Sequence, residues 1–242
     1  MDLSVLDRHQ KIALQFSGGK DSLACVFLLK DYWDRLTVYY LDTGDSFPET
    51  RETVACIKSL VPNFVVVQGK SKEVRQTLGI PSDIVPVSAT EFGRVFAGHD
   101  SIAIIDRYTC CFHSIMLPMH QQMIKDQITL IIRGQKQSDK RKSPVKSGET
   151  VEGFEFLYPF DTWADEAVME YLDAVDAPIP RFYKTLTSAP DCMTCTGWLE
   201  ERRSAFLKTH HPEAYAIYLS RIRLIKNEVA VYCDLLYAEV SP

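Results

Sequence analysis

The chain has 242 residues, of which 46% are hydrophobic and 24% are charged, and this composition can bury a sizeable globular core. No apolar run approaches the roughly 20 residues that span a bilayer, and residues 1–10 do not resemble a secretory signal, so we expect a cytoplasmic protein without a membrane segment. The formal net charge of −5 excludes a generally cationic surface for wrapping duplex DNA, so any anion site must be local.

Buried strands and helices alternate through the first part of the chain. The residue pattern predicts a strand at 11–16, a helix at 22–30 and a second strand at 36–41. Pro48 suits the first turn of the next helix, and a third strand is predicted at 63–67. Right-handed crossovers between parallel strands place helices on both faces of a sheet. The alternation therefore predicts an α/β fold with a Rossmann-like parallel sheet flanked by helices.

The middle of the chain has a weaker pattern. Residues 70–106 carry glycines, prolines and little periodicity, which predicts loops and short helices. Two further buried strands are predicted at 127–132 and 154–158. The most polar stretch of the protein, residues 133–153, lies between these two strands.

The C-terminal part is predicted to be mainly helical. Thr162 can cap a helix whose first turn is acidic at Asp165, and helices are expected again from Gly197. A final strand is predicted at 229–232. Because there is no internal repeat and no clear linker, we expect a single domain over residues 1–242, mainly helical from about residue 160 onward.

A glycine-rich hexapeptide follows the first predicted strand and opens the first predicted helix. It consists of Ser17, Gly18, Gly19, Lys20, Asp21 and Ser22. Backbone N–H groups and the helix dipole favour anions at such a position, and the two glycines allow the backbone to approach a ligand closely. Lys20 adds a point charge, and the hydroxyls of Ser17 and Ser22 can donate to phosphate oxygens. It is not a Walker loop, because Asp21 follows the lysine, and the alternative interpretation is a glycine turn with solvated charges.

A basic run follows the strand predicted at 127–132. Residues 133–146 contain six Lys or Arg and one acid, a local charge of +5 in a chain whose total is −5. Ligands of open α/β sheets bind beyond the carboxyl ends of the strands, where this run, the hexapeptide and residues 42–44 would all emerge. The contrast in charge predicts a polyanionic substrate, and the alternative is a charge run that is only solvated.

The hexapeptide resembles the loop with which PP-loop adenine-nucleotide enzymes grip the pyrophosphate of ATP. Residues 41–50 (LDTGDSFPET) are similar to the second-strand signature of the phosphoadenosine and adenosine phosphosulfate reductase branch. Residues 134–141 (GQKQSDKR) are similar to the basic substrate loop of this branch, and residues 159–171 to its Trp-containing helix start. Because the four matches occur in the family's order, the chain is identified as a member of the phosphosulfate reductase family. This resemblance implies an adenine-nucleotide alpha-hydrolase-like fold.

The resemblance also implies roles for residues of these motifs. The residues expected to bind the nucleotide are Ser17, Gly18, Gly19, Lys20, Asp21, Ser22, Asp42, Thr43 and Gly44. The residues expected to bind substrate are Arg133, Lys136, Ser138, Asp139 and Arg141. The residues expected to act in catalysis are Lys20, Asp21, Arg133 and Lys136, and the basic residues among them would neutralise charge on a leaving pyrophosphate. Asp42 is expected to position Mg²⁺ or the ribose, and the alternative is a strand-end acid that only caps a turn.

Four of the seven cysteines form two close pairs in the sequence. They are Cys110, Cys111, Cys192 and Cys195. Four soft thiolate ligands in two pairs are what a cubane iron–sulfur cluster requires, and the arrangement resembles the CC…CxxC pattern of the iron–sulfur members of the reductase family. Zinc is the main alternative, because four thiolates also satisfy its tetrahedral geometry, and four unconnected thiols are a third possibility. Cys25 and Cys56 are predicted to be small core residues.

Two departures from the reductase pattern decide the predicted activity. The ATP-type loop is intact here, whereas the loop of true phosphosulfate reductases is usually degenerate. The Glu-Cys-Gly-x-His tail of those reductases, whose cysteine attacks sulfur, is missing, and Cys233 is predicted to be a strand residue rather than a nucleophile. We therefore expect an enzyme of sulfur metabolism with a [4Fe-4S] cluster that cleaves ATP to AMP and pyrophosphate and adenylates an acceptor for sulfur transfer.

Two other functions stay open. One is a thioredoxin-dependent reductase that forms sulfite from adenosine phosphosulfate or its 3′-phosphorylated form, in which Cys233 would be essential. The other is a non-catalytic nucleotide or redox sensor. The acceptor, a small molecule or a nucleic acid, is not identified by the sequence. A sulfur donor or a thioredoxin-like reductant is an expected partner, and we expect a homodimer.

Overall fold

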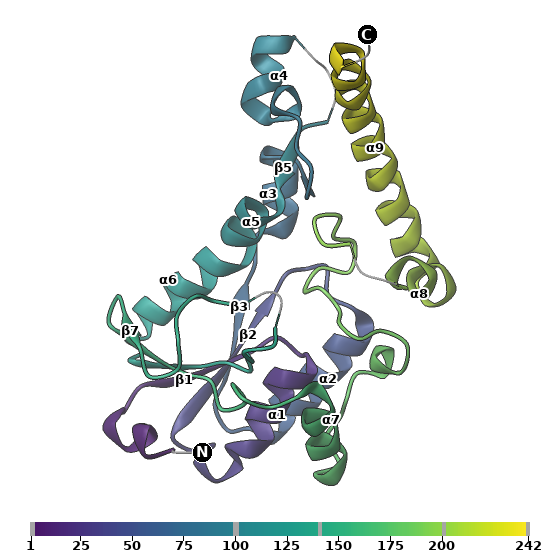
Figure 1. Ribbon diagram of the computed structural model, residues 1–242. Helices are drawn as coiled ribbons and strands as arrows, with labels where there is room; N and C mark the ends of the chain where they lie inside the picture. The colour runs from purple at the N-terminus through teal and green to yellow at the C-terminus, as the bar shows by residue number, and fades with distance from the viewer. Residues whose placement is uncertain (1–2, 99–101, 140–141, 200–201, 241–242) are drawn as a thin grey trace. The chain divides into compact units, whose positions relative to one another are not determined.

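The computed structural model describes residues 3–98, 102–139, 142–199 and 202–240. The chain forms two compact units, whose elements are labelled in Figure 1. Unit 1 comprises residues 1–42, 46–68 and 119–184, and unit 2 comprises residues 43–45, 69–118 and 185–242. Within the described ranges, no helix combines the length and the apolar character that crossing a bilayer requires.

Unit 1 is built on a six-stranded sheet with the order β3-β2-β1-β6-β8-β7, in which every neighbouring pair is parallel except β7 and β8. The strands are β1 (Ile12–Phe16), β2 (Leu36–Asp42), β3 (Phe64–Gln68), β6 (Leu130–Ile132), β7 (Thr150–Val151) and β8 (Phe154–Leu157). The helices are α1 (Lys20–Leu28), α2 (Pro48–Leu60), most of α6 (Leu117–Lys125) and α7 (Asp165–Ala174), with the 3-10 turns η1 (Ser4–Arg8), η2 (Lys30–Tyr32) and η5 (Arg181–Lys184). The predicted Rossmann-like parallel sheet flanked by helices is confirmed.

The core of unit 1 explains why these segments fold as they do. Alternation along β1 directs Ile12, Leu14 and Phe16 to one face of the sheet, and none of them is more than 3% exposed. They belong to one apolar cluster with Leu23 of α1 and Val168 of α7. Because β1 ends inside this cluster, the hexapeptide leaves the core at the carboxyl edge of the sheet.

Two expectations for unit 1 need correction. A strand is predicted at 127–132, but the observed strand β6 covers only Leu130–Ile132. Gln127 adopts a φ of 57° in the turn after α6 and is therefore not part of a strand. Thr162 does not cap α7, whose N-cap is Ala164 without a side-chain hydrogen bond. The helix starts later than expected because residues 159–162 form turns.

Unit 2 contains a two-stranded parallel sheet and several helices. Its elements are α3 (Ser71–Thr77), β4 (Ile80–Ser82), η3 (Val87–Ala89), α4 (Glu91–Ala97), β5 (Ile104–Asp106), α5 (Arg107–Cys111), the π-helical turn η4 (Phe112–Met116), α8 (Arg203–His210) and α9 (Pro212–Val240). The short helices expected in residues 70–106 are present, as is the mainly helical C-terminal part. The pairing of β4 with β5 is not predicted by the sequence pattern, because each strand has only three residues.

The strand predicted at 229–232 is wrong, because these residues lie inside α9. No glycine or proline interrupts residues 213–240, so nothing in the local sequence ends the helix. Ala214 and Tyr218, one helical turn apart, are buried. Cys233 is consequently an exposed helical residue and not a strand residue.

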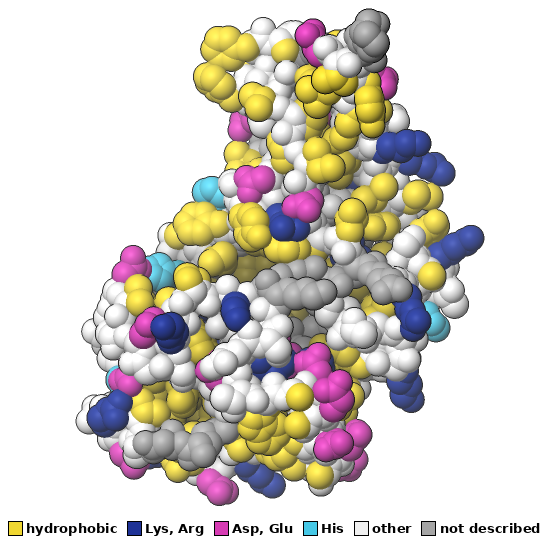
Figure 2. Space-filling model, viewed as in Figure 1, with side chains coloured by type: hydrophobic (Ala, Val, Ile, Leu, Met, Phe, Trp, Pro, Cys, Tyr) yellow, Lys and Arg dark blue, Asp and Glu magenta, His cyan; other side chains and the backbone are white. Residues whose placement is uncertain are grey.

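Large apolar side chains are exposed on α4 and near the end of α9. Phe92, Phe96, Leu236 and Tyr237 are each at least 68% exposed, and hydrophobic surface is seen in the upper part of Figure 2. Exposed apolar patches of this kind mark interaction sites in many proteins. The expected homodimer stays a prediction.

Candidate nucleotide site and cysteine centre

The loop after β1 is held in shape by its own serines. The N–H of Ser17 donates to Ser22 Oγ at 3.2 Å, and Ser22 Oγ donates to the carbonyl of Gly19 at 3.0 Å. Gly18 has a φ of +80°, and a Cβ at this position would lie 2.5 Å from a side-chain atom of α2, so only glycine fits without strain. α1 begins at Lys20, and its N-cap Gly19 offers no side-chain cap. The first amides of α1 are therefore directed to the sheet edge, where an anion can bind.

Two lysines and three aspartates form one charge network beside this loop. Lys20 Nζ lies 3.0 Å from Asp21 Oδ2 and 3.0 Å from Asp165 Oδ1. Lys136 Nζ lies 2.5 Å from Asp21 Oδ1 and 3.0 Å from Asp165 Oδ1. A third carboxylate oxygen, Oδ1 of Asp139, is 3.1 Å from the same nitrogen, and the Lys136 side chain is fully buried. The structure thus joins Lys20, Asp21 and Lys136, three of the residues predicted for catalysis.

Gly134 allows the segment after β6 to approach the loop. A Cβ at this position would lie 2.4 Å from the backbone carbonyl carbon of Asp21, so no larger residue fits unless the backbone moves. The close approach of the two backbones explains how the buried Lys136 reaches the loop. The structure therefore brings together the hexapeptide and the segment that resembles the family's basic substrate loop.

The network shifts the pKa values of Lys136 and Asp165 in the directions that favour their charged forms. Burial by itself lowers the pKa of Lys136, but the hydrogen bond to Asp21 and the neighbouring carboxylates raise that pKa above its ordinary value overall. Burial by itself raises the pKa of Asp165. Hydrogen bonds from Lys20 and Lys136 outweigh burial and hold the pKa of this carboxyl below its usual range. The sequence does not single out Asp165 as a site residue, and its acidic position at the start of α7 is the one signal that could have found it.

Arg133 has a different environment from the lysines. Its Nε donates to Gln15 Oε1 at 2.7 Å, and its guanidinium carbon lies 5.3 Å from the centre of the Phe156 ring. Burial lowers the pKa of Arg133, and no acidic side chain among the described residues offsets this effect. The hydroxyl of Tyr158 is also buried and has no hydrogen-bond partner within the described part of the chain. An acceptor atom placed beside this hydroxyl would satisfy it.

The remaining residues predicted to bind substrate are Ser138, Asp139 and Arg141, and they differ in their surroundings. Asp139 Oδ2 accepts a hydrogen bond from the backbone N–H of Lys136 at 2.9 Å, so Asp139 stabilises the turn. Ser138 is exposed. Arg141 lies outside the described residues. The local charge of +5 is therefore not a uniform solvated run, because Lys136 is directed inward to carboxylates.

Tyr183 of η5 lies over the N-terminus of α1. Its hydroxyl accepts a hydrogen bond from the backbone N–H of Lys20 at 3.1 Å and is 3.1 Å from the position of a Cβ on Gly19. Burial raises the pKa of Tyr183, so the phenol is neutral. The sequence does not predict a role for Tyr183, because η5 contains none of the recognised motifs. The phenol uses the amide that a phosphate oxygen would need.

We expect the Tyr183→Phe variant to bind ATP about two- to ten-fold more tightly than the wild-type protein. The substitution removes a competitor for the Lys20 amide, and one hydrogen bond contributes about 0.5–1.5 kcal/mol. Isothermal titration calorimetry with ATP measures the effect, and Tyr32→Phe, at the opposite end of α1, is the matched control. A weaker affinity for Tyr183→Phe would mean that the phenol contacts the nucleotide instead of competing with it.

The remaining residues predicted to bind the nucleotide lie at the end of β2 and directly after it. Asp42 is the last residue of this strand and lies at the same carboxyl edge as the loop after β1. Thr43 and Gly44 are part of unit 2. Gly44 has a φ of +73°, which favours glycine at this turn. Thr43 Oγ1 donates to the carbonyl of Asp191 at 3.2 Å.

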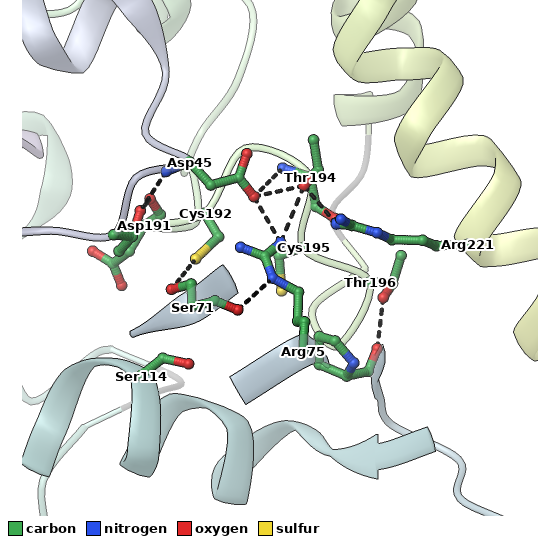
Figure 3. Close-up of polar contacts among 12 residues, drawn as sticks. Asp45, Ser71, Arg75, Ser114, Asp191, Cys192, Thr194, Cys195, Thr196 and Arg221 are labelled. Carbon is green, nitrogen blue, oxygen red and sulfur yellow. Dashed lines mark hydrogen bonds and ion pairs between the residues drawn. The ribbon is translucent and has the colours of Figure 1, made fainter. Parts of the chain in front are cut away.

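The four cysteines of the two sequence pairs line one cavity of unit 2. The cavity has a volume of about 320 Å³, and part of this volume is open to solvent. Cys110 and Cys111 end α5, and Cys192 and Cys195 lie in the loop before α8, where Figure 3 shows them. The fold thus brings together both pairs, although about eighty residues separate them in the sequence.

The cysteine environment suits metal binding rather than free thiol chemistry. Burial raises the pKa of Cys192 to about 12 and that of Cys111 to about 11, so these thiols are protonated at neutral pH when no cation is bound. Ser71 Oγ lies 3.4 Å from Cys192 Sγ, and Ser114 Oγ lies 3.8 Å from Cys110 Sγ. Hydroxyls at these positions can stabilise sulfur ligands of a cluster.

The lining of the cavity also fits an anionic tetrathiolate complex. Arg75 and Arg107 line it together with the cysteines, and the Arg107 guanidinium stacks 3.9 Å above the Trp198 ring. In the part of the chain that the structure describes, no three His, Cys, Asp or Glu side chains converge on one metal ion. A cubane cluster places iron and sulfide between its thiolates, so it tolerates wider cysteine spacing than a single zinc ion does. Four thiolate donors can hold either a [4Fe-4S] cluster or a zinc ion.

The fold and the loop together define a class of protein, an α/β nucleotide-using enzyme of the PP-loop type. A family model described as the phosphoadenosine phosphosulfate reductase domain matches residues 11–198. The chain belongs to the phosphoadenosine phosphosulfate reductase family. This membership confirms the resemblance found in the sequence motifs.

Two solved structures show the same fold. The phosphoadenylyl-sulfate reductase of Candida auris, a phosphate complex, is 13% identical with a TM-score of 0.55, over 79% of this chain and 88% of that one. The U34-tRNA thiolase NcsA of Methanococcus maripaludis, solved with its [4Fe-4S] cluster, is 15% identical with a TM-score of 0.50, over 93% of this chain and 75% of that one. No curated protein matches the chain.

Proposed function

We propose that this chain binds ATP through residues 17–22 and cleaves it between the α and β phosphates. An acceptor oxygen attacks the α phosphorus, the bond to the pyrophosphate breaks, and the acceptor loses its proton as AMP is attached to it. The observation that carries the proposal is the loop itself, in which the N-cap residue Gly19 provides no side-chain cap to α1 and the ammonium groups of Lys20 and Lys136 meet at Asp165. Family membership supports a nucleotide as the ligand.

The protein's own residues supply charge stabilisation in this reaction. Negative charge builds up on the leaving pyrophosphate, and the loop amides, Lys20 and the Arg133 guanidinium are the groups that neutralise it. Asp21 and Asp165 form ion pairs with both lysines and hold the two ammonium groups in place. Mg²⁺, which accompanies ATP, would lower the charge of the phosphates further, with Asp42 as its expected ligand.

We further propose that Cys110, Cys111, Cys192 and Cys195 hold a [4Fe-4S] cluster. When bound, the cluster would bind or deliver sulfur, or brace the site. The four cysteines share a cavity with two arginines and two serines, and the structurally similar thiolase from Methanococcus maripaludis carries such a cluster. Zinc is the alternative occupant. The acceptor, the sulfur donor and a cytoplasmic location stay predictions.

A second candidate is a reductase that forms sulfite from a phosphosulfate with electrons from a thioredoxin-like protein. The family model is named for this reaction, and the similar Candida auris protein is described as such a reductase. The chain offers only Cys233 as a late cysteine, and this residue is exposed on α9. Under this second function the Cys233→Ser variant would lose all activity.

One experiment separates these functions. Protein purified without oxygen is analysed for iron, sulfide and zinc, and its absorption spectrum is recorded before and after ATP, adenosine phosphosulfate or its 3′-phosphorylated form is added. We expect about four irons per chain, a response to ATP and release of pyrophosphate. A response only to a phosphosulfate, with sulfite formed, would favour the reductase. Nucleotide binding without any turnover would favour a sensor, and zinc in place of iron would remove the cluster from the proposal.

A further inference from the structure

Asp45 connects the segment after β2 to the residues between Cys192 and Cys195. The backbone carbonyl of Asp45 accepts a hydrogen bond from the N–H of Met193 at 2.6 Å. Its carboxylate Oδ2 accepts from the N–H of Thr194 at 3.3 Å and from the Thr194 hydroxyl at 2.5 Å. Both residues between the two cysteines are therefore bound to one aspartate, and Figure 3 shows the contacts of its carboxylate with Thr194.

Two arginines complete the contacts of the Thr194 hydroxyl. Arg75 of α3 donates from Nη1 to Thr194 Oγ1 at 3.2 Å and to Asp45 Oδ2 at 2.8 Å. Arg221 of α9 donates from Nη1 to Thr194 Oγ1 at 2.6 Å and to the Thr194 carbonyl at 3.1 Å. A hydroxyl has one proton and two lone pairs, so Thr194 donates to Asp45 and accepts from both arginines with no capacity left over.

The contacts of Arg75 continue to the first cysteine of the pair. Its Nε donates to the carbonyl of Ser71 at 2.9 Å, and the Ser71 hydroxyl lies 3.4 Å from Cys192 Sγ. The carboxylate of Asp45 and the guanidinium of Arg75 are 16% and 11% exposed, so water competes little for these bonds. The network therefore holds the Cys192–Cys195 loop from both sides.

We propose that Asp45 is a positioning residue that ties the Cys192–Cys195 loop to the segment 42–44, so that a nucleotide held by this segment shifts the cysteine loop. Asp45 follows Gly44 directly, and its own N–H donates to Thr43 Oγ1 at 3.2 Å. A change in the backbone of residues 42–44 therefore reaches the Thr194 hydroxyl through one residue. The coupling rests on the proposed function, because ATP must be the ligand of segment 42–44.

Two substitutions at Thr194 test the network with nearly constant side-chain volume. Thr194→Val keeps the shape but removes the donor and both acceptor sites, whereas Thr194→Ser keeps the hydroxyl. In hydrogen–deuterium exchange of the full chain without ATP, we expect the amides of residues 193–196 to exchange at least about ten-fold faster in Thr194→Val and at the wild-type rate in Thr194→Ser. Equal exchange in Thr194→Val and the wild-type protein would overturn the positioning role.

The coupling itself is measured by repeating the exchange with saturating ATP. We expect ATP to change the exchange of residues 193–196 in the wild-type protein and in Thr194→Ser, and to leave it unchanged in Thr194→Val and Asp45→Asn. Calorimetry should show ATP affinities within about two-fold of each other for all four proteins. An unchanged ATP response in Thr194→Val would overturn the coupling. If the wild-type protein binds no ATP in calorimetry, the proposed function fails, while the exchange without ATP still decides whether Asp45 positions the cysteine loop.

Discussion

The Lys20→Ala variant should lose nucleotide binding and turnover while keeping its fold. Lys20 is the first residue of α1, its side chain is 9% exposed, and its ammonium group is the positive charge that the hexapeptide itself contributes. A hydrogen bond to a charged group contributes about 1.5–3 kcal/mol, so the ATP affinity should fall by one to two orders of magnitude. Pyrophosphate release should fall at least as far, since the same charge stabilises the leaving pyrophosphate. The fold should survive because Asp21 and Asp165 keep Lys136 as a partner.

Calorimetry with ATP, an assay of released pyrophosphate and a thermal unfolding curve measure these effects together. Lys58→Ala is the matched control, because Lys58 is an exposed lysine of α2. This control should match the wild-type protein in all three measurements. Wild-type ATP affinity and pyrophosphate release in the Lys20→Ala variant would show that the hexapeptide is not the nucleotide site.

The Cys192→Ser variant should lose the cluster. A serine oxygen is a hard, weakly acidic ligand, whereas iron–sulfur clusters are held by soft thiolates. Protein purified without oxygen should therefore contain about four irons per wild-type chain and less than half of this amount in the variant. Iron and sulfide analysis, with the visible absorption spectrum, measures the loss.

Cys233→Ser is the matched control for this experiment. Cys233 is exposed on α9 and does not line the cavity of the other four cysteines. The iron content and the absorption spectrum of the Cys233→Ser variant should equal those of the wild-type protein. If Cys192→Ser retained the full iron content, the assignment of the cavity as the cluster site would be wrong, and zinc analysis of both proteins would show whether another metal is present.

The parts of the fold that follow from local patterns were predictable from the sequence. The apolar side chains of residues 11–16 and 36–41 are frequent enough to identify β1 and β2 from the sequence. Pro48 correctly indicated the start of α2. The strand predicted at 229–232 was wrong because the local pattern there did not decide the structure. Its β-branched residues favour strands locally, but a helix of 29 residues without an interrupting glycine or proline continues through them.

The candidate site was predictable only in part. The glycines of the hexapeptide and the four cysteines carry their chemistry in residue type and spacing, so the sequence alone identified them. Asp165, Tyr183 and Thr194 carry no such signal, because aspartate, tyrosine and threonine are common at surfaces and helix ends. Their roles depend on which side chains the fold places beside them.

The sequence by itself determined the class of fold, the position of the phosphate-type loop after β1 and the presence of four cysteines in two close pairs. Only the tertiary structure decided which charges meet. Lys136 is 115 residues from Asp21 in the chain, and they meet because β1 and β6 are neighbours in the sheet and Gly134 allows their loops to touch. Pairing of this kind depends on strand order and backbone approach, and neither is encoded in any short stretch of residues.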